Sequence, residues 1–192
     1  MSHFITPKIP VSSCQVADTR VTIDGMRDKT YVDKGKLGNG LFARYPIREG
    51  EIIYRFSGKT IDFKEAASRG DKECWSLQID KDTYIDTEAP GCYANHSCEP
   101  NAGIKNIVEL IALRDIPADA EIRFDYSTTM DEDYYQMNCD CGCQTCRKVV
   151  TDFKWLPAAT RERYLRQGIV MEFIARQYVV SDSTTRQAMR ES

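Results

Sequence analysis

Short apolar stretches, separated by residues that favour turns, run through most of the chain. Within residues 16–123 the turn signals recur about every 8–12 residues, a spacing that is typical of a β-rich fold. Residues 63–69 break this pattern, and their polar, alanine-containing sequence predicts one or two helical turns. Strands are expected at residues 41–45, 51–56, 75–79, 83–86, 107–113 and 121–124.

The pattern changes after Tyr126. Residues 127–138 are polar and are expected to form a loop, and a group of cysteines follows them. Residues 157–178 carry helical signals, and Gly168 is expected to separate two helices that pack on the domain. The expected organisation is a flexible N-terminus at 1–15, a β-rich domain at 16–128, a cysteine-rich segment at 129–150, and a helical extension at 151–192 with a frayed end at 181–192.

The composition fits a single folded domain. The chain has 192 residues, of which 42% are hydrophobic, so it can bury a core of its own. Its net charge of −3 gives no sign of the basic face that a dedicated nucleic-acid-binding protein usually has. The sequence lacks an apolar run of about 18 residues, which a membrane-spanning helix needs, and it lacks the start of a secretory signal. We therefore expect an intracellular protein that binds neither nucleic acid nor membrane.

Four of the 8 cysteines crowd into one short segment: Cys139, Cys141, Cys143 and Cys146. In an intracellular chain, cysteines spaced this closely are typical of a metal site, and a site held by disulfides alone is the less favoured alternative. Zinc binds thiolates and usually takes four ligands in a closed structural site. Cys139, Cys141 and Cys146 are expected to supply three of them.

Three short segments of the sequence, here called islands, resemble the motifs of a known protein family. The first is Lys-Leu-Gly-Asn-Gly-Leu-Phe-Ala at 36–43, the second runs from Tyr-Ile-Asp at 84–86 to Asn-His-Ser-Cys-Glu-Pro-Asn at 95–101, and the third joins Glu-Ile-Arg-Phe-Asp-Tyr at 121–126 to the cysteines. In this order and spacing they resemble the SET-domain protein-lysine methyltransferases, including their cysteine-rich post-SET segment, over about residues 33–147. The resemblance implies a mainly β SET fold with short helices and a threaded C-terminal segment, followed by the post-SET zinc loop and C-terminal helices.

The resemblance implies S-adenosylmethionine as the methyl donor. Glycines let the backbone approach a ligand where a Cβ would clash, and the resemblance places residues 38–41 against the methionine part of the cofactor. The Asn-His pair at 95–96 is implied to bind the adenosyl part rather than to act as a general base. Taken alone, the glycines would indicate an ordinary turn, and the Asn-His pair a hydrogen-bonded turn. The implied cofactor contacts are Gly38, Asn39, Gly40, Leu41, Trp75, Tyr93, Asn95 and His96.

Tyr126 is the candidate catalytic residue, because a phenol hydroxyl can orient the substrate amine at hydrogen-bond distance. In the implied reaction a neutral lysine amine attacks the methyl group of a sulfonium, so the protein mainly positions both partners. Phe124 matches the position at which the family uses Phe or Tyr to set the number of methyl groups, and phenylalanine there predicts di- or trimethylation. Without the resemblance, Tyr126 would be interpreted as a buried tyrosine at a strand end.

The resemblance also implies the fourth zinc ligand. Cys139, Cys141 and Cys146 form its Cys-x-Cys-x4-Cys pattern, and Cys98 completes the set from the Asn-His-Ser-Cys island. Such an ion would hold the post-SET segment on the loop that carries cofactor contacts. Cys143 stays open as a substitute ligand.

The implied function is S-adenosylmethionine-dependent methylation of a lysine ε-amine on a histone or another protein tail. Its location is the nucleus in a eukaryote or the cytoplasm in a bacterium. The alternative is a catalytically inactive, zinc-stabilised SET-like binding module, which failure to bind the cofactor would support. The acidic run at 131–133 is interpreted as a solvated loop rather than a site for a basic tail.

Overall fold

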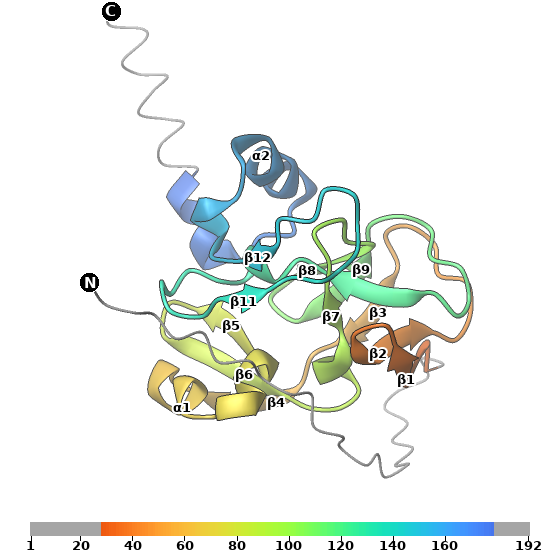
Figure 1. Cartoon of the computed structure of the whole chain (residues 1–192), viewed down its shortest axis with the longest axis horizontal. Coiled ribbons are helices and arrows are strands. Elements are labelled where there is room, and N and C mark those ends of the chain that lie inside the picture. Colours follow the sequence, from red (N-terminus) through yellow and green to blue (C-terminus); the bar gives the residue numbers. More distant parts are fainter. Residues whose placement is uncertain (1–27, 179–192) are drawn as a thin grey trace, which may run out of the picture.

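The computed structural model describes residues 28–178 of the chain. The expected flexible N-terminus and frayed end lie outside these residues. The described part is rich in short strands with few, short helices, which confirms the predicted fold class (Figure 1). No helix within it has both the length and the apolar character needed to cross a membrane.

The first sheet has the strand order β1-β2-β10-β7. β1 and β2 form an antiparallel hairpin in which Gly35 faces Gly38. β10 pairs antiparallel with β2 and parallel with β7, so it lies between two segments that are far apart in the sequence. The bounds are β1 Thr30–Gly35, β2 Gly38–Ala43, β7 Asn95–His96 and β10 Glu121–Phe124.

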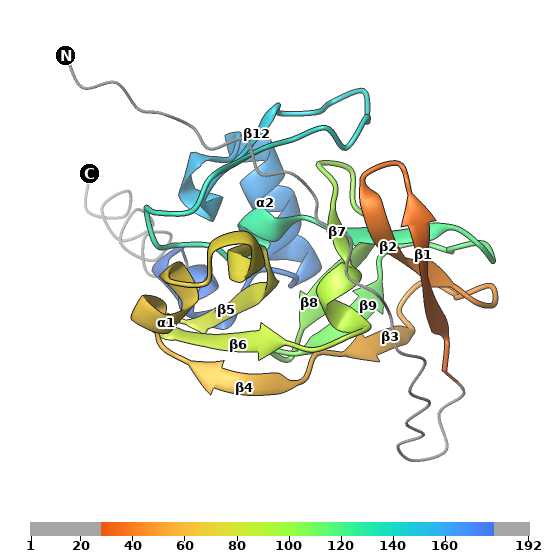
Figure 2. The ribbon, with the colours of Figure 1, turned by 60° about the horizontal axis from the view of Figure 1, so that its bottom comes forward.

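Two antiparallel three-stranded sheets, β3-β9-β8 and β4-β6-β5, and one two-stranded sheet complete the β structure. The pair β11–β12 joins the two ends of the cysteine segment. In Figures 1 and 2, the β1–β2 hairpin and helix α2 lie on opposite sides of the molecule, with β7 between them. The bounds are β3 Ile52–Arg55, β4 Gly58–Ile61, β5 Ser76–Asp80, β6 Thr83–Thr87, β8 Ala102–Lys105, β9 Glu109–Ala112, β11 Met137–Asn138 and β12 Val149–Val150.

Local sequence signals set the helix ends. The Asp62 carboxylate caps α1 by accepting a hydrogen bond from the Glu65 amide at 2.8 Å. α2 is capped at its C-terminal end by Gly168, whose left-handed φ of 64° suits glycine. Residues 172–178 are again helical, so Gly168 separates two helices as predicted. The labelled α-helices are α1 Phe63–Ala67 and α2 Ala158–Gln167, and the 3-10 turns are η1 Gly70–Trp75, η2 Gly91–Tyr93, η3 Tyr126–Thr128 and η4 Phe153–Trp155.

The C-terminal helical segment packs into the main hydrophobic core. Phe153, Tyr164, Ile169 and Ile174 are all fully buried in the same cluster as the strands. Gly103 of β8 makes room for Ile169, because a Cβ at Gly103 would approach that side chain to 2.7 Å. This segment therefore supports the domain that carries the candidate site.

Some predicted boundaries are wrong. Trp75 belongs to η1 rather than to the strand that follows it. Ile107 lies in a turn with a φ of 72°, and β9 begins only at Glu109. The predicted loop at 127–138 contains most of η3 and ends in β11. Trp75 and Ile107 have the apolar character of strand residues but lie in tight turns. Residues 137–138 belong to a polar stretch but form a short strand, because strand preference depends on the neighbouring structure.

Candidate active site and metal centre

Strand β10 brings the three sequence islands together. Ile122 pairs with Leu41 of the glycine island on one side, and Phe124 pairs with His96 of the second island on the other. Tyr126 follows immediately beyond the strand. The Leu41 side chain is fully buried in the core, so only its backbone can face a ligand.

Both ends of the 95–101 loop form hydrogen bonds with β10. At one end, the Ser97 amide donates to the Phe124 carbonyl at 3.0 Å. At the other end, the Asn101 side chain donates to the Glu121 carbonyl and accepts from the Arg123 amide, both at 2.8 Å. The motif thereby fixes the position of the strand that presents Tyr126.

The glycine island and the Asn-His pair meet at one carboxylate. Asn95 Nδ2 donates to the Asn39 carbonyl at 3.0 Å and to Glu121 Oε1 at 2.8 Å. A Cβ at Gly40 would come within 2.6 Å of the same Glu121 oxygen, so this position requires glycine unless that side chain shifts. Gly38 has a φ of 100°, in the region that favours glycine. The Asn95 amide is therefore engaged internally, which leaves backbone groups to face a ligand here.

Two further candidate cofactor contacts, Trp75 and Tyr93, pack on each other. The rings of Trp75 and Tyr93 lie edge to face, with their centroids 6.0 Å apart. η2, which ends at Tyr93, packs against β2 of the glycine island. Trp75 instead lines the aromatic cleft described below. The structure thus places η2 beside the glycine island and Trp75 at the cleft.

His96 is buried between the candidate metal centre and the candidate catalytic residue. Its Nδ1 accepts a hydrogen bond from the Tyr126 amide at 3.2 Å, and its Nε2 lies 3.3 Å from Cys98 Sγ. Burial lowers the pKa of His96 to about 4, against the raising effect of nearby Asp125. A neutral imidazole ring whose two nitrogens both contact other protein groups suits a positioning role better than the role of a general base.

Tyr126 and Phe124 lie side by side. Their ring centroids are 4.9 Å apart, and the Tyr126 hydroxyl donates to the Ala94 carbonyl at 3.0 Å. Burial raises the pKa of Tyr126 well above its usual value, so the hydroxyl is protonated near neutral pH. Phe124 also packs edge to face on Phe56, with centroids 6.1 Å apart. The pair therefore presents one hydroxyl donor within an aromatic wall.

These rings border a cleft of about 60 Å³ between η1 and the 129–135 segment. Its lining combines aromatic rings, two carboxylates and two thiols: Phe56, Phe63, Trp75, Tyr84, Phe124, Tyr126, Tyr135, Glu73, Glu132, Cys74 and Cys92. Such a lining suits an alkyl chain that ends in a cation.

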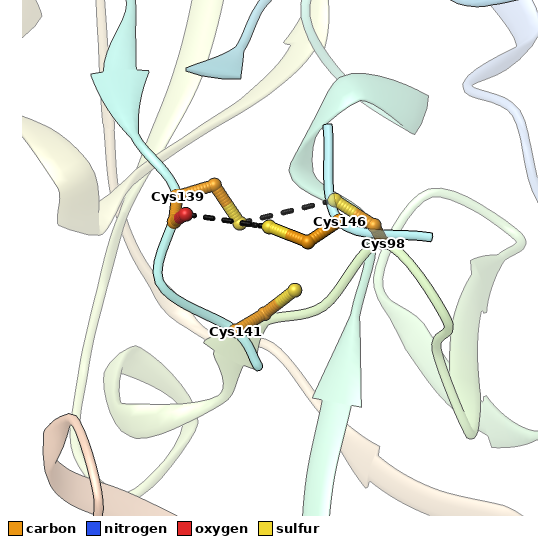
Figure 3. A group of neighbouring side chains, drawn as sticks. All are labelled: Cys98, Cys139, Cys141 and Cys146. Atoms are coloured by element: carbon orange, nitrogen blue, oxygen red, sulfur yellow. Dashed lines mark hydrogen bonds between the residues drawn. The ribbon is translucent and has the colours of Figure 1, made fainter. Parts of the chain in front are cut away.

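The four predicted metal ligands form one cluster. The Sγ atoms of Cys98, Cys139, Cys141 and Cys146 all lie within 4.8 Å of one another and point toward a shared centre (Figure 3). The Cys98–Cys139 and Cys139–Cys146 sulfur separations are 3.8 and 3.6 Å. A tetrahedral zinc ion with Zn–S bonds of about 2.3 Å requires sulfurs about 3.8 Å apart. Cys143 lies outside this group, although its sulfur is 3.4 Å from that of Cys141.

The donor chemistry also fits a metal. Burial raises the pKa of Cys98 to about 12, so its thiolate is unfavourable unless a cation lies beside it. The Arg147 amide donates to the same sulfur at 3.4 Å, which is the kind of outer contact that orients a metal ligand. These residues can therefore hold a zinc ion.

A buried charge network next to Tyr126 was not found by sequence reasoning. The Arg147 guanidinium donates to both Asp125 oxygens at 2.7 and 2.8 Å, and the Tyr164 hydroxyl donates to Asp125 at 3.0 Å. The Asp125 side chain is completely buried. The network joins the residue before Tyr126 to the cysteine segment and to α2. A carboxylate at the end of an apolar strand indicates that a basic or hydrogen-bonding partner is buried with it. The sequence does not show which residue that partner is.

The acidic run at 131–133 is a solvated loop only in part. Asp131 accepts a hydrogen bond from Gln177 at 2.7 Å, and Asp133 forms an ion pair with Lys154 at 2.5 Å, both on the surface. Glu132 between them is half-buried and accepts a short hydrogen bond from the Tyr84 hydroxyl within the cleft. The prediction of a solvated loop is therefore wrong for Glu132.

Part of this chain is similar to known proteins. Residues 38–127 match the SET domain family. The "Variant-silencing SET domain-containing protein" of Plasmodium falciparum is 32% identical over 131 residues, which cover 57% of this chain and 5% of that protein. Human "Histone-lysine N-methyltransferase 2B" is 32% identical over 128 residues, covering 58% and 5%. Arabidopsis thaliana "Histone-lysine N-methyltransferase ASHH2" is 28% identical over 130 residues, covering 59% and 7%.

The chain spans less than a tenth of the length of these relatives. The similarity therefore concerns the domain and not the whole of those proteins. The domain match includes the glycine island, the Asn-His-Ser-Cys motif and the strand that leads to Tyr126. This chain contains a SET domain, in residues 38–127, similar to those of the histone-lysine methyltransferases.

Proposed function

We propose that this chain is an S-adenosylmethionine-dependent protein-lysine N-methyltransferase. The observation that carries the proposal is that β10 sets Tyr126 and Phe124 into the wall of an aromatic cleft, directly beside the glycine island and the Asn-His pair. The similarity to SET domains of histone-lysine methyltransferases supports the same activity. The proposed substrate is an exposed lysine of a histone or another protein, and with a histone substrate the proposed location is the nucleus.

Glu121 of β10 links the glycine island to a polar hollow that suits the proposed cofactor. A polar hollow of about 250 Å³ lies beside Glu121 and Arg123 of β10, and residues 141–143 of the cysteine segment also line it. The Glu121 carboxylate reaches from there to Gly40 and Asn95. A polar lining suits a cofactor that carries several charged groups. When bound, the sulfonium cofactor supplies a methyl group that is already electrophilic.

The chain's own residues position the amine and exclude water. The aromatic cleft desolvates the lysine ammonium and so lowers its pKa, which favours the neutral, nucleophilic amine. The protonated Tyr126 hydroxyl and the Ala94 carbonyl that it contacts are the polar groups that orient this amine. Phe124, which lacks a hydroxyl, leaves space beside the amine for methyl groups already added.

The proposed metal centre would hold the cofactor side together. Cys98 lies two residues from His96, and Cys139, Cys141 and Cys146 come from the segment that lines the polar hollow. Zinc bound to the four thiolates would therefore attach this segment to the Asn-His loop. The role of the zinc ion would be structural, because cysteine side chains would occupy all four coordination positions.

The test of the proposal is transfer of labelled methyl groups from S-adenosylmethionine to purified histones and, in parallel, to a whole-cell lysate. We expect labelling of a lysine-containing protein that excess S-adenosylhomocysteine suppresses. A folded, zinc-loaded sample that neither transfers methyl groups nor binds the cofactor in calorimetry would reject the enzyme. That outcome would favour the zinc-stabilised binding module.

A second prediction concerns the number of methyl groups. The wild-type protein is expected to yield di- or trimethyl-lysine, and Phe124→Tyr is expected to stop at monomethyl-lysine, because the added hydroxyl takes the space beside the amine. Mass spectrometry of an exhaustively reacted peptide measures both. A wild-type reaction that stops at one methyl group would contradict the prediction.

A further inference from the structure

The aromatic cleft contains a second polar end besides Tyr126. Glu132 and Glu73 line it from two different elements, the 129–135 segment and η1. Tyr135 lines the same cleft as both carboxylates and Tyr126. One cleft thus runs from the proposed lysine position to a pair of acids.

The two carboxylates have no basic partner among the described residues. No ion pair within residues 28–178 involves Glu73 or Glu132, whereas the neighbouring Asp133 is paired with Lys154. Burial raises the pKa of both glutamates, and the charge of Glu132 raises that of Glu73 further. Two acids that repel each other in a partly dry cleft are stabilised by any cation that enters between them.

Aromatic rings surround this end of the cleft. Tyr84, which donates to Glu132, lies 6.3 Å from Phe63 between ring centroids, and Phe63 packs edge to face on Tyr134 at 5.3 Å. Ring faces attract cations, and guanidinium groups stack on them especially well. The cavity, the two carboxylates and the rings therefore describe a site for a flat or rounded cation on a long side chain.

We propose that the Glu73–Glu132 end of the cleft is a subsite for a second basic side chain of the protein substrate, an arginine that flanks the methylated lysine. This inference rests on the proposed function. An arginine fits better than a lysine, because its planar guanidinium can face both carboxylates and stack on a ring at once. The substrate class is then a lysine with an arginine nearby in the sequence.

The experiment compares two synthetic peptide libraries with one fixed lysine. In the first, arginine is placed in turn at each position near the lysine, and in the second, citrulline, its neutral isostere, replaces it. We expect the wild-type protein to transfer labelled methyl groups to the best arginine peptide at least about fivefold faster than to its citrulline twin, the effect of one charge pair in a water-accessible cleft. In Glu73→Gln/Glu132→Gln the ratio is expected to fall below about twofold.

Asp131→Asn is the matched control, since its carboxylate lies in the same run but is held by Gln177 on the surface. It is expected to keep the wild-type ratio. Equal rates on both libraries in the wild type, or an unchanged ratio in the double variant, would overturn the subsite while methyl transfer itself upholds the enzyme. No transfer to any peptide, to histones or to lysate would overturn both. The wild-type ratio needs no variant, so a double variant that fails to fold does not remove the test.

Discussion

Replacing Tyr126 with phenylalanine is expected to lower kcat by about 10²–10³-fold, which corresponds to about 3–4 kcal/mol of transition-state stabilisation. The hydroxyl donates to the Ala94 carbonyl inside the cleft and, because burial raises its pKa, stays a donor near neutral pH. Its removal leaves the ring in place beside Phe124 and His96 but takes away the group that orients the amine. Steady-state methyl transfer to a lysine peptide measures the loss.

The control for this substitution is Tyr31→Phe. It removes a hydroxyl of the same kind, bonded to Asp119 at 2.8 Å on the exposed face of β1. We expect unchanged kcat there, and for Tyr126→Phe a cost of about 1–3 kcal/mol in folding stability from the Ala94 carbonyl left without its donor. Full activity of a folded Tyr126→Phe protein would contradict the assignment of Tyr126.

Sequence patterns predicted the strands that combine a clear apolar alternation with turn residues at both ends. β10 has the predicted bounds, Glu121–Phe124, because its apolar Ile122 and Phe124 alternate with charged residues. β4 and β8 were missed because one is largely exposed and starts with Gly58, and the other contains Gly103. Glycine weakens the local preference for a strand, so only the neighbouring strands decide that these segments pair.

The residues of the candidate site also divide into those that the sequence predicts and those that it does not. Residues within a motif, such as His96 and Cys98, could be assigned because the motif itself fixes their spacing. The partners of Asp125 could not, because Arg147 and Tyr164 come from two separate later elements whose packing no local pattern encodes. The prediction that Glu132 is solvated is wrong for a related reason. Its acidic neighbours favour a solvated loop, and only the tertiary fold brings its carboxylate to the Tyr84 hydroxyl.

Removing the metal is expected to release the cysteine segment and to abolish methyl transfer. Structural zinc contributes roughly 10 kcal/mol or more in small zinc-dependent folds, which is comparable to the whole stability of a typical domain. Cys139, Cys141 and Cys146 lie in a segment whose β structure is the short β11–β12 pair and which is also held by single contacts such as that of Arg147 with Asp125. A chelator is therefore expected to lower Tm and to raise amide hydrogen exchange over residues 137–150. Cofactor binding should weaken with it, because Cys98 and His96 share one short loop.

The ligand set itself is tested by two cysteine-to-serine variants. Cys98→Ser removes a sulfur from the cluster of four and is expected to leave the purified protein short of stoichiometric zinc by elemental analysis, with a lowered Tm. Cys143→Ser makes the same chemical change in the cysteine segment, outside the cluster of four, and it is expected to keep its zinc and its Tm. The opposite result, with zinc lost from Cys143→Ser and kept in Cys98→Ser, would show that the cysteine segment binds its metal without the Asn-His loop. The metal would then stabilise the segment alone, and it could not couple that segment to the residues that present Tyr126.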